Sequence, residues 1–395
     1  MRRVTKKLLN LIVGLALIGL YCEFIIYYIV IAQCSWPTLT NTRNKEVLKA
    51  FILADTHLLG PFRGHWLDKL RREWQMHQAF QAVIKIHKPD VVFVLGDLFD
   101  EGEWTNDQQF HDYVDRFYSL FALPKDIQMF VAVGNHDIGF HNRIRRKALQ
   151  RFTDRLKSPL VQHVVLKNTH IIVINSMAME GDSCNMCAEA RRQISLVSDK
   201  LMKCSKNCEN HSYNYSQPIL MQHFPLYRKS DAICTEPDAP PLPERNKLFR
   251  LKIDALSKEA TEYLISNIQP RAVFGGHTHH GCLVKHSYKN NEFLEYSVPS
   301  FSWRNRPDPK FMLKNGRRNI NDFYKASGTC SKECRHRGSQ GGLSYFLEGL
   351  VSPDRRRSNA LIPEFANEHL PLILFFLKIC AYLLRLQHKA RVMLL

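Results

Sequence analysis

The chain has 395 residues and a mass of 46.0 kDa, enough for one large domain or two small ones. Its 45% apolar and 23% charged residues exclude a disordered tail, a collagen-like fibre and a small disulfide scaffold. The net charge is +18, and most of it comes from the two ends of the chain. Residues 8–300 are nearly balanced, with 34 basic and 30 acidic groups. We therefore expect no nucleic-acid partner.

The N-terminus contains one segment that can span a membrane. Residues 11–33 include 22 mostly apolar positions, from Leu11 to Ala32, and Glu23 is the one charge among them. Four basic residues within residues 1–10 predict a cytoplasmic N-terminus, so the rest of the chain would be lumenal. The alternative is a cleaved signal peptide, but its apolar region is only about 7–15 residues long. A transmembrane signal anchor is favoured.

The cysteines support a lumenal body. Five of the eleven lie within 51 residues, at Cys184, Cys187, Cys204, Cys208 and Cys234. A zinc knuckle is one interpretation of this spacing, and loop disulfides in an oxidising compartment are the favoured one. Glycosylation acceptors at Asn210 and Asn214 point to exposure. We expect loop insertions at 182–217 and 231–246.

Short apolar runs and a helical pattern alternate between residues 50 and 300. A helix is expected over 65–87, with Trp66, Leu70 and Trp74 packed on a sheet and Pro89 after its end. The alternation predicts an α/β fold with largely buried strands. The predicted strands are 50–54, 91–95, 129–133, 170–174, 218–221 and 272–274.

Polar residues of one kind follow five of these strands. In an α/β sheet, ligands collect at the carboxyl ends of the strands, so these residues are expected at one edge. Their carboxylate, imidazole and amide groups suit manganese, iron or zinc. The candidate ligands are Asp55, His57, Asp97, Asn135, His223, His277 and His279. Seven ligand groups are more than one tetrahedral ion can bind, and they fit two ions that share a carboxylate. Such a pair of ions can hold a phosphoryl group.

The motif order D-x-H, G-D, G-N-H-D, single His and G-H-x-H over residues 48–280 resembles the calcineurin-like metallophosphoesterases. The resemblance implies a four-layer sandwich of two β-sheets flanked by helices. It also implies that Asp55, His57 and His279 hold one ion, that Asn135, His223 and His277 hold the other, and that Asp97 bridges them. His136 would act on the phosphate and the leaving oxygen, and Asp137 would orient its ring.

Within that family, the segments ADTHLLG, GHWLDKLRREWQM, QHFPLYRKSDA and VPSFSWRNR resemble the membrane-anchored enzymes that remodel GPI anchors. The resemblance implies a manganese-dependent phosphodiesterase that removes ethanolamine phosphate from the second mannose of GPI. Zinc and iron remain alternative metals. A phosphomonoesterase or protein phosphatase with the same centre and a non-catalytic cargo adaptor are the alternative functions. Arg304 would contact substrate phosphate or lie on the surface.

The same resemblance implies a cellular location and interaction partners. We expect a membrane protein of the endoplasmic reticulum exit sites, the intermediate compartment and the cis-Golgi, with residues 34–311 as its lumenal catalytic domain. GPI-anchored proteins, the membrane and the cargo machinery of the exit sites are the expected partners. Residues 312–395 form a basic, divergent tail, in which Lys378 interrupts a membrane-associated segment at 371–384.

Overall fold

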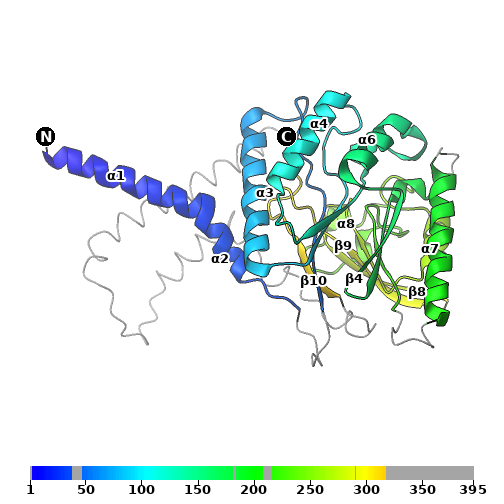
Figure 1. Ribbon diagram of the computed structural model, residues 1–395. Coiled ribbons are helices and arrows are strands. Elements are labelled where there is room, and N and C mark those ends of the chain that lie inside the picture. The colour runs from blue at the N-terminus through cyan, green and yellow to red at the C-terminus, as the bar shows by residue number, and fades with distance from the viewer. Residues whose placement is uncertain are drawn as a thin grey trace, which may run out of the picture. The chain divides into compact units, whose positions relative to one another are not determined.

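The computed structural model describes residues 2–37, 47–180, 184, 186–207, 216–289 and 291–316 (Figure 1). The described residues divide into two units, residues 2–34 and residues 35–316. The predicted glycosylation sites at Asn210 and Asn214, the predicted segment 371–384 and most of the predicted tail lie outside the described residues.

The N-terminal unit is one continuous helix. It runs through α1 (Arg2–Leu20), a π-helical turn (Tyr21–Ile25) that contains Glu23, and α2 (Ile26–Ala32). Among the described residues, its stretch Arg3–Ala32 is the one helix long and apolar enough to cross a membrane. This agrees with the predicted anchor in length and composition, and the lumenal orientation stays a prediction.

The second unit contains two sheets. In the first, β1 (Leu48–Leu53), β2 (Val91–Leu95) and β3 (Gln128–Ala132) are parallel. The sequence predicts a strand at each of these three places. An antiparallel strand, β10 (Met312–Gly316), completes the order β10-β1-β2-β3. The sheet therefore continues beyond residue 311, where the domain was predicted to end.

The second sheet has six strands in the order β4-β5-β6-β7-β9-β8. Its parallel centre of β5, β6, β7 and β9 is flanked by antiparallel β4 and β8. The bounds are β4 (Val161–Leu166), β5 (Thr169–Ile174), β6 (Ile219–Met221), β7 (Ala272–Gly275), β8 (Cys282–Tyr288) and β9 (Asn291–Ser297). Ile52 and Phe93 of the first sheet share one buried cluster with Val173 and Phe274 of the second. The two sheets therefore face each other across the core.

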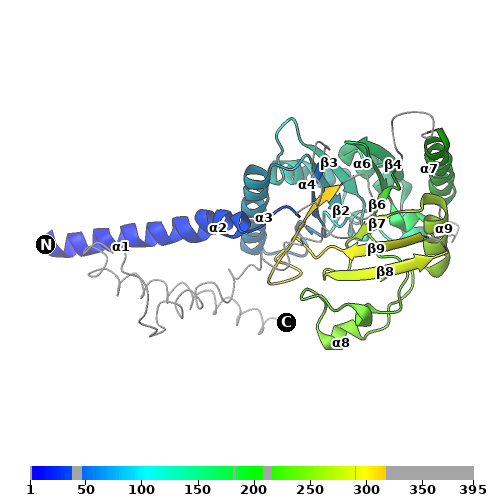
Figure 2. The same ribbon diagram turned by 90° about the horizontal axis from the view of Figure 1, so that it is seen from below.

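Helices cover the outer faces and complete four layers. In Figures 1 and 2, α3 lies at the side of the first sheet, and α7 lies at the far side of the second sheet. The longer helices are α3 (Trp66–His87), α4 (Asp107–Leu120), α6 (Arg146–Leu156), α7 (Cys187–Asn207) and α9 (Lys258–Ile268). Two short helices, α5 (Asn135–Ile138) and α8 (Leu242–Arg245), lie in loops. The predicted sandwich is confirmed.

The predicted apolar stripe of α3 is wrong at its start. Trp66 and Leu70 are 67% and 60% exposed, and the buried residues of the helix begin at Met76. A 22-residue helix is about 33 Å long, whereas the six-residue strand β1 covers about 20 Å. The first turns of α3 therefore extend past the sheet. The helix ends at His87, and Lys88 adopts the left-handed conformation before Pro89.

The predicted insertion at 182–217 is not a loop throughout. It contains the 21-residue helix α7, which packs against α9 and β4. Its many charged residues lie on the outer face, so its composition resembles that of a surface loop. Disulfides join Cys184 to Cys187 and Cys234 to Cys282, which confirms the disulfide interpretation at these cysteines. Cys204 is a free thiol, and Cys208 is outside the described residues.

Lys314 on β10 is a buried amine whose charged form destabilises the fold. Its ammonium has no hydrogen-bond partner within the described residues and lies 4.0 Å from the ring centroid of Tyr296. Burial lowers the pKa of Lys314 from 10.5 to about 7. The unfolded state then binds the extra proton between these two values, so stability due to this group rises with pH across that window.

We expect Lys314→Met to raise the melting temperature most at pH 7 and below, and progressively less toward pH 10. Thermal unfolding followed by circular dichroism at several pH values measures this difference. Lys203→Met, at an exposed position of α7, is the matched control and should change the melting temperature little at any pH. A stabilisation by Lys314→Met that is the same at every pH would contradict the pKa assignment.

Candidate metal centre

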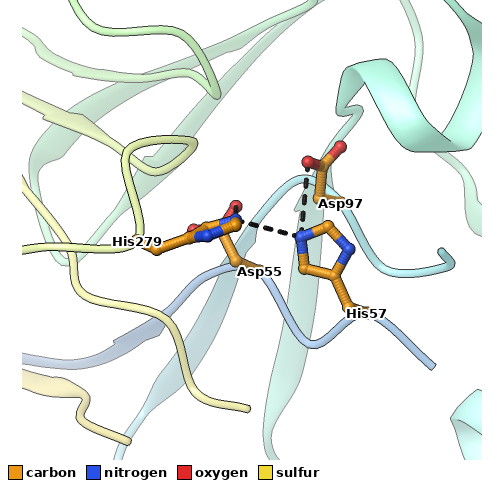
Figure 3. Close-up of side chains that lie close together, drawn as sticks. All are labelled: Asp55, His57, Asp97 and His279. Carbon is orange, nitrogen blue, oxygen red and sulfur yellow. Dashed lines mark hydrogen bonds and ion pairs between the residues drawn. The ribbon is translucent and has the colours of Figure 1, made fainter. Parts of the chain in front are cut away.

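All seven predicted ligands meet at one edge of the sandwich. Loops that leave the carboxyl ends of β1, β2, β3, β6 and β7 carry them, and these ends meet where the two sheets face each other. Figure 3 shows Asp55, His57, Asp97 and His279 directed toward a common centre. The edge predicted from the strand ends is the edge that the structure shows.

The first group of ligand atoms surrounds the Nε2 atom of His57. This atom lies 3.2 Å from Nε2 of His279 and 3.6 Å from Oδ2 of Asp97. Nε2 of His279 is 3.9 Å from Oδ1 of Asp55. One ligand atom from each of these four residues lies within 4.8 Å of the others, which is close enough for one ion.

The second group shares Asp97 with the first. Nε2 of His223 lies 3.3 Å from Oδ2 of Asp97 and 3.1 Å from Oδ1 of Asn135. Ligand atoms of Asp97, His223 and His277 also lie within 4.8 Å of one another. Oδ2 of Asp97 therefore stands between the two groups, as a bridging ligand must.

Hydrogen bonds fix which nitrogen of each imidazole faces the centre. Nδ1 of His57 donates to Asp100 Oδ1 at 3.2 Å, and Nδ1 of His223 donates to the Leu95 carbonyl at 2.8 Å. Nε2 of His277 donates to the Ile253 carbonyl at 2.8 Å. In each ring the other nitrogen faces the centre and can bind a metal when the ring is neutral, which is the usual arrangement around a protein-bound metal.

The remaining atoms of the centre fit a cation. Nδ1 of His277 is buried and has no hydrogen-bond partner among the described residues. The facing Nε2 atoms of His57 and His279 would place two lone pairs 3.2 Å apart if neither carried a proton. One divalent ion would satisfy the facing nitrogens of His57 and His279, and a second would satisfy Nδ1 of His277. The oxygen and nitrogen donors suit Mn²⁺, Fe or Zn²⁺.

The pKa values of the histidines differ across the centre. Burial, with nearby His223, lowers the pKa of His277 to about 3, and burial with nearby His57 lowers that of His279. These rings are neutral at physiological pH, the form that binds metals. Burial also opposes the charged form of His223, but Asp97 and Asp55 outweigh it and raise the pKa of His223 to about 9. The carboxylates thus attract positive charge to this point.

The backbone of the ligands is strained. Asp55, His57, Asp97, His277 and His279 have φ values of 56°, 44°, 49°, 72° and 60°. This left-handed region costs a residue other than glycine about 1–3 kcal/mol, although Asp and His tolerate it better than most. Backbone hydrogen bonds oppose the strain. Asp55 N donates to Gly96 O at 3.1 Å, and His57 N donates to Asp97 O at 3.0 Å.

Two glycines allow the close packing. Gly96 has φ 83°, and a Cβ atom there would lie 2.5 Å from Nδ1 of His223. A Cβ atom on Gly134 would lie 2.1 Å from both the amide nitrogen and Oδ1 of Asp97. Both positions therefore exclude any side chain, which explains the G-D and G-N-H-D motifs.

His136 lies at the mouth of the centre. Its backbone N donates to Asp97 Oδ1 at 2.9 Å, and its Nδ1 donates to the Asp100 carbonyl at 3.1 Å. Its side chain is 32% exposed, and its ring centroid is 4.8 Å from that of His57. The ring is therefore fixed at one nitrogen and accessible from outside.

The predicted role of Asp137 is wrong. Its carboxylate is buried and accepts hydrogen bonds from the backbone amides of Leu98, Phe99 and Gly134, at 2.9, 3.0 and 2.8 Å. It therefore joins the loops after β2 and β3 and does not orient the ring of His136. The preference of a carboxylate for several amide donors explains this position.

Asp100 performs the orienting role that the sequence did not assign. Its carboxylate accepts from His57 and forms an ion pair with Arg304, and Arg63 Nη1 lies 3.8 Å away. The position of Asp100, shortly after Asp97 and at the end of the same strand, was the feature of the sequence that could have indicated this role. Arg304 is partly buried on Asp100, so it is not a simple surface residue. The Ile253 carbonyl that holds His277 is a backbone group, which no residue pattern identifies.

Comparison with known proteins gives the class. The family model described as calcineurin-like phosphoesterase matches residues 48–281. The chain belongs to this family, and its centre is that of a metal-dependent phosphoesterase.

Its relatives include proteins named Metallophosphoesterase 1. The one from Ailuropoda melanoleuca is 45% identical over 324 residues, 79% of this chain and 81% of the relative. The Drosophila melanogaster homolog is 47% identical over 300 residues, 74% and 79% of the two chains. A purple acid phosphatase from yellow lupin seeds matches at TM-score 0.40 and 12% identity over 69% of this chain and 50% of its own, too distant to refine the assignment.

We expect Asp97→Asn to lose both metal ions. The amide oxygen is uncharged and cannot balance two cations, and its NH₂ group would face nitrogen lone pairs. Elemental analysis of the purified full chain by mass spectrometry measures the metal content. The control is Asp112→Asn on α4, an exposed carboxylate outside the centre that should retain the parent's metal content. Full metal content in Asp97→Asn would contradict the bridging role.

Proposed function

We propose that the protein is a phosphodiesterase that removes side-branch ethanolamine phosphate from the second mannose of GPI anchors. The main observation in favour of a binuclear phosphoesterase is the position of Asp97. Its Oδ2 lies 3.6 Å from His57 Nε2 and 3.3 Å from His223 Nε2, so it can contact an ion on either side. Support for the substrate comes from the relatives named Metallophosphoesterase 1 and from the resemblance of the segments around the centre to GPI-remodelling enzymes.

The metals that we propose are two manganese ions, with zinc or iron as alternatives. When bound, such a pair supplies Lewis acidity toward a phosphoryl group and lowers the pKa of water. Asp55, His57 and His279 would hold one ion, and Asn135, His223 and His277 the other, with Asp97 shared. Buried carboxylates together with neutral imidazoles give this edge a set of ligands that favours cations.

His136 has the position of a general acid. Since its Nδ1 donates to the Asp100 carbonyl, Nε2 is the nitrogen left to act on substrate. A proton on Nε2 can pass to the mannose oxygen as the bond from phosphorus to that oxygen breaks. Asp100 fixes the ring of His57 through its carboxylate and that of His136 through its carbonyl, so both imidazoles depend on one residue.

The setting that we propose is the lumen of the early secretory pathway, from the exit sites of the endoplasmic reticulum to the cis-Golgi. The helix Arg3–Ala32, with basic residues at its start, supports membrane attachment with a cytoplasmic N-terminus. The disulfides Cys184–Cys187 and Cys234–Cys282 support an oxidising compartment. GPI-anchored proteins and the exit-site cargo machinery would be the partners.

The function is tested with the full chain in detergent, because β10 lies beyond the predicted domain end. We expect Mn²⁺-dependent loss of ethanolamine phosphate from GPI glycan, followed by mass spectrometry, and no loss with Asp97→Asn. Cleavage of aryl phosphate monoesters alone would instead support the phosphomonoesterase or protein phosphatase alternative. Metal content without turnover of either substrate would support the cargo adaptor.

The same assay tests His136. His136→Ala should retain the parent's metal content and lose about 10²–10⁴-fold in rate, the usual contribution of general acid catalysis. His111→Ala on α4, an exposed histidine away from the centre, should retain the parent's rate. Unchanged turnover in His136→Ala would remove this residue from the mechanism.

A further inference from the structure

The loop between β6 and α9 exposes an unusual number of aliphatic side chains. We call its residues 242–253, with the sequence LPERNKLFRLKI, the rim segment. Leu242, Leu248, Leu251 and Ile253 are 66%, 78%, 50% and 40% exposed. Single exposed aliphatic residues are ordinary, but four within twelve positions are a density that favours a partner.

The rim segment borders the metal centre. The Ile253 carbonyl accepts the hydrogen bond from Nε2 of His277, and the Lys252 carbonyl accepts a hydrogen bond from Nε2 of His141. Phe249 turns inward, its N donates to the Lys229 carbonyl at 2.8 Å, and its ring lies 5.3 Å from the guanidinium of Arg228. Any surface that contacts the rim segment is therefore next to the site of the chemistry.

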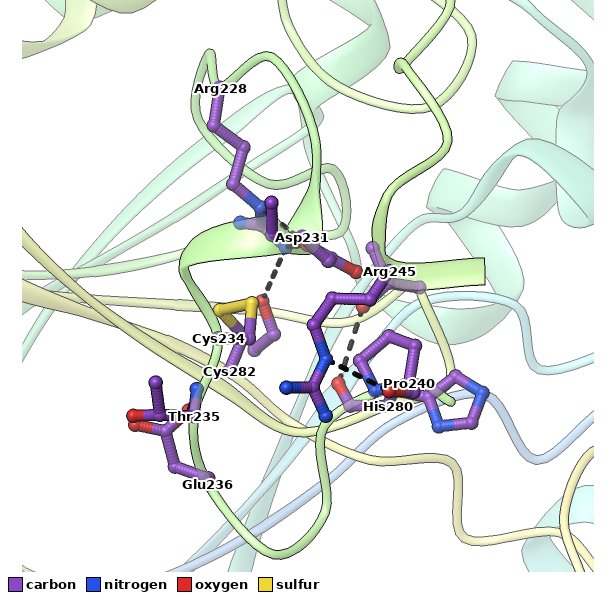
Figure 4. The surroundings of a disulfide bond; sticks show 12 residues. Arg228, Asp231, Cys234, Thr235, Glu236, Pro240, Arg245, His280 and Cys282 are labelled. Atoms are coloured by element: carbon purple, nitrogen blue, oxygen red, sulfur yellow. Dashed lines mark hydrogen bonds and ion pairs between the residues drawn. A yellow bond between two sulfur atoms is a disulfide. The ribbon is translucent and has the colours of Figure 1, made fainter. Parts of the chain in front are cut away.

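The chain before the rim segment is held rigidly. Figure 4 shows the disulfide between Cys234 and Cys282, which ties this loop to the start of β8. Beside it, Arg228 forms an ion pair with Asp231 at 2.8 Å, and Arg245 donates to the Pro240 carbonyl at 3.0 Å. The exposed aliphatic residues are thus presented on a fixed frame, which lowers the entropy lost when they are buried.

A second exposed apolar group follows β1 at the same edge of the sandwich. It comprises Phe62, Trp66, Leu67 and Leu70, which are 73%, 67%, 55% and 60% exposed. Both loops leave the carboxyl ends of strands that lead into metal ligands. The amide of Phe62 donates to Glu101, the residue after Asp100, so the second group also lies near the centre. Trp and Phe at an exposed edge are typical of contact with a membrane interface.

Charge favours an acidic partner. Residues 242–254 contain four basic and two acidic residues. Arg250 pairs with Asp254 at 2.8 Å, Lys252 Nζ lies 3.9 Å from Glu180, and Glu244 lies 3.7 Å from His280. Among the described residues, the positive charge of this segment that is left without an ion pair is therefore that of Arg245 and Lys247. Lys247, between Leu242 and Leu248, adds to this basic character. A second copy of the same surface would be repelled, whereas anionic lipid headgroups attract it.

We propose that the rim segment binds the surface of an anionic phospholipid bilayer, with its aliphatic side chains in the interfacial layer. The chain also carries the apolar helix Arg3–Ala32, which can hold the domain near a bilayer. One weak interfacial contact combined with an anchor gives stable docking, because the second contact is then intramolecular. This inference does not depend on the GPI substrate.

The test measures contact with lipid at single positions. Full-length chain carrying Leu248→Trp is placed in nanodiscs of brominated phosphatidylcholine, with and without phosphatidylserine. The quenching of the added indole is obtained by subtracting the parent protein. The matched control is Leu196→Trp on α7, a leucine that is 54% exposed and far from this loop in the sequence.

With phosphatidylserine present, we expect a blue shift and greater bromine quenching at position 248 than at position 196. The excess should be lost in high salt and in the background of Lys247→Glu with Arg250→Glu. Equal quenching at the two positions in both lipid mixtures overturns the proposal. That result would instead fit an acidic protein partner. Because the readout is independent of turnover, it separates this inference from the proposed function.

Discussion

The buried carboxylate of Asp97 is the group on which the centre depends. Its Oδ2 faces His57 on one side and His223 on the other, and its Oδ1 accepts the amide of His136. Nearby His223 keeps it ionised even though burial favours the neutral acid, so the pKa of Asp97 lies well below its usual value. An isolated buried carboxylate is unfavourable, and two cations beside it remove that penalty.

The scaffold must hold strained ligands near this carboxylate. Five of the seven predicted ligands have left-handed backbone angles, and Gly134 packs against Asp97 with no room for a Cβ atom. Residues outside the ligand set keep the geometry in place. Asp137 joins two loops through backbone amides, and Asp100 fixes the rings of His57 and His136. Mutation of such supporting groups typically costs about 10–100-fold in metal affinity or activity.

The sequence predicts the centre better than its surroundings. Buried parallel strands are short apolar runs, and the polar residues after them must share an edge, so β1, β2 and the ligands were predictable. The start of α3 was not, because periodicity shows which residues share a face and not where the sheet ends. The many charged residues of α7 led to the prediction of a loop where a helix lies. The residues of β10 were assigned to the tail, because their pairing with β1 is not visible in the sequence. The carbonyls of Leu95 and Ile253, which orient His223 and His277, are backbone groups and could not be predicted from residue types.

The most direct test is the electron paramagnetic resonance spectrum of the full chain loaded with manganese. If Asp97 bridges two ions, they lie about 3.5–4 Å apart, as in other two-metal sites, and their spins are coupled. We predict a multiline spectrum from an exchange-coupled pair, with two manganese ions bound per chain. A simple six-line spectrum with one ion per chain would contradict the binuclear centre.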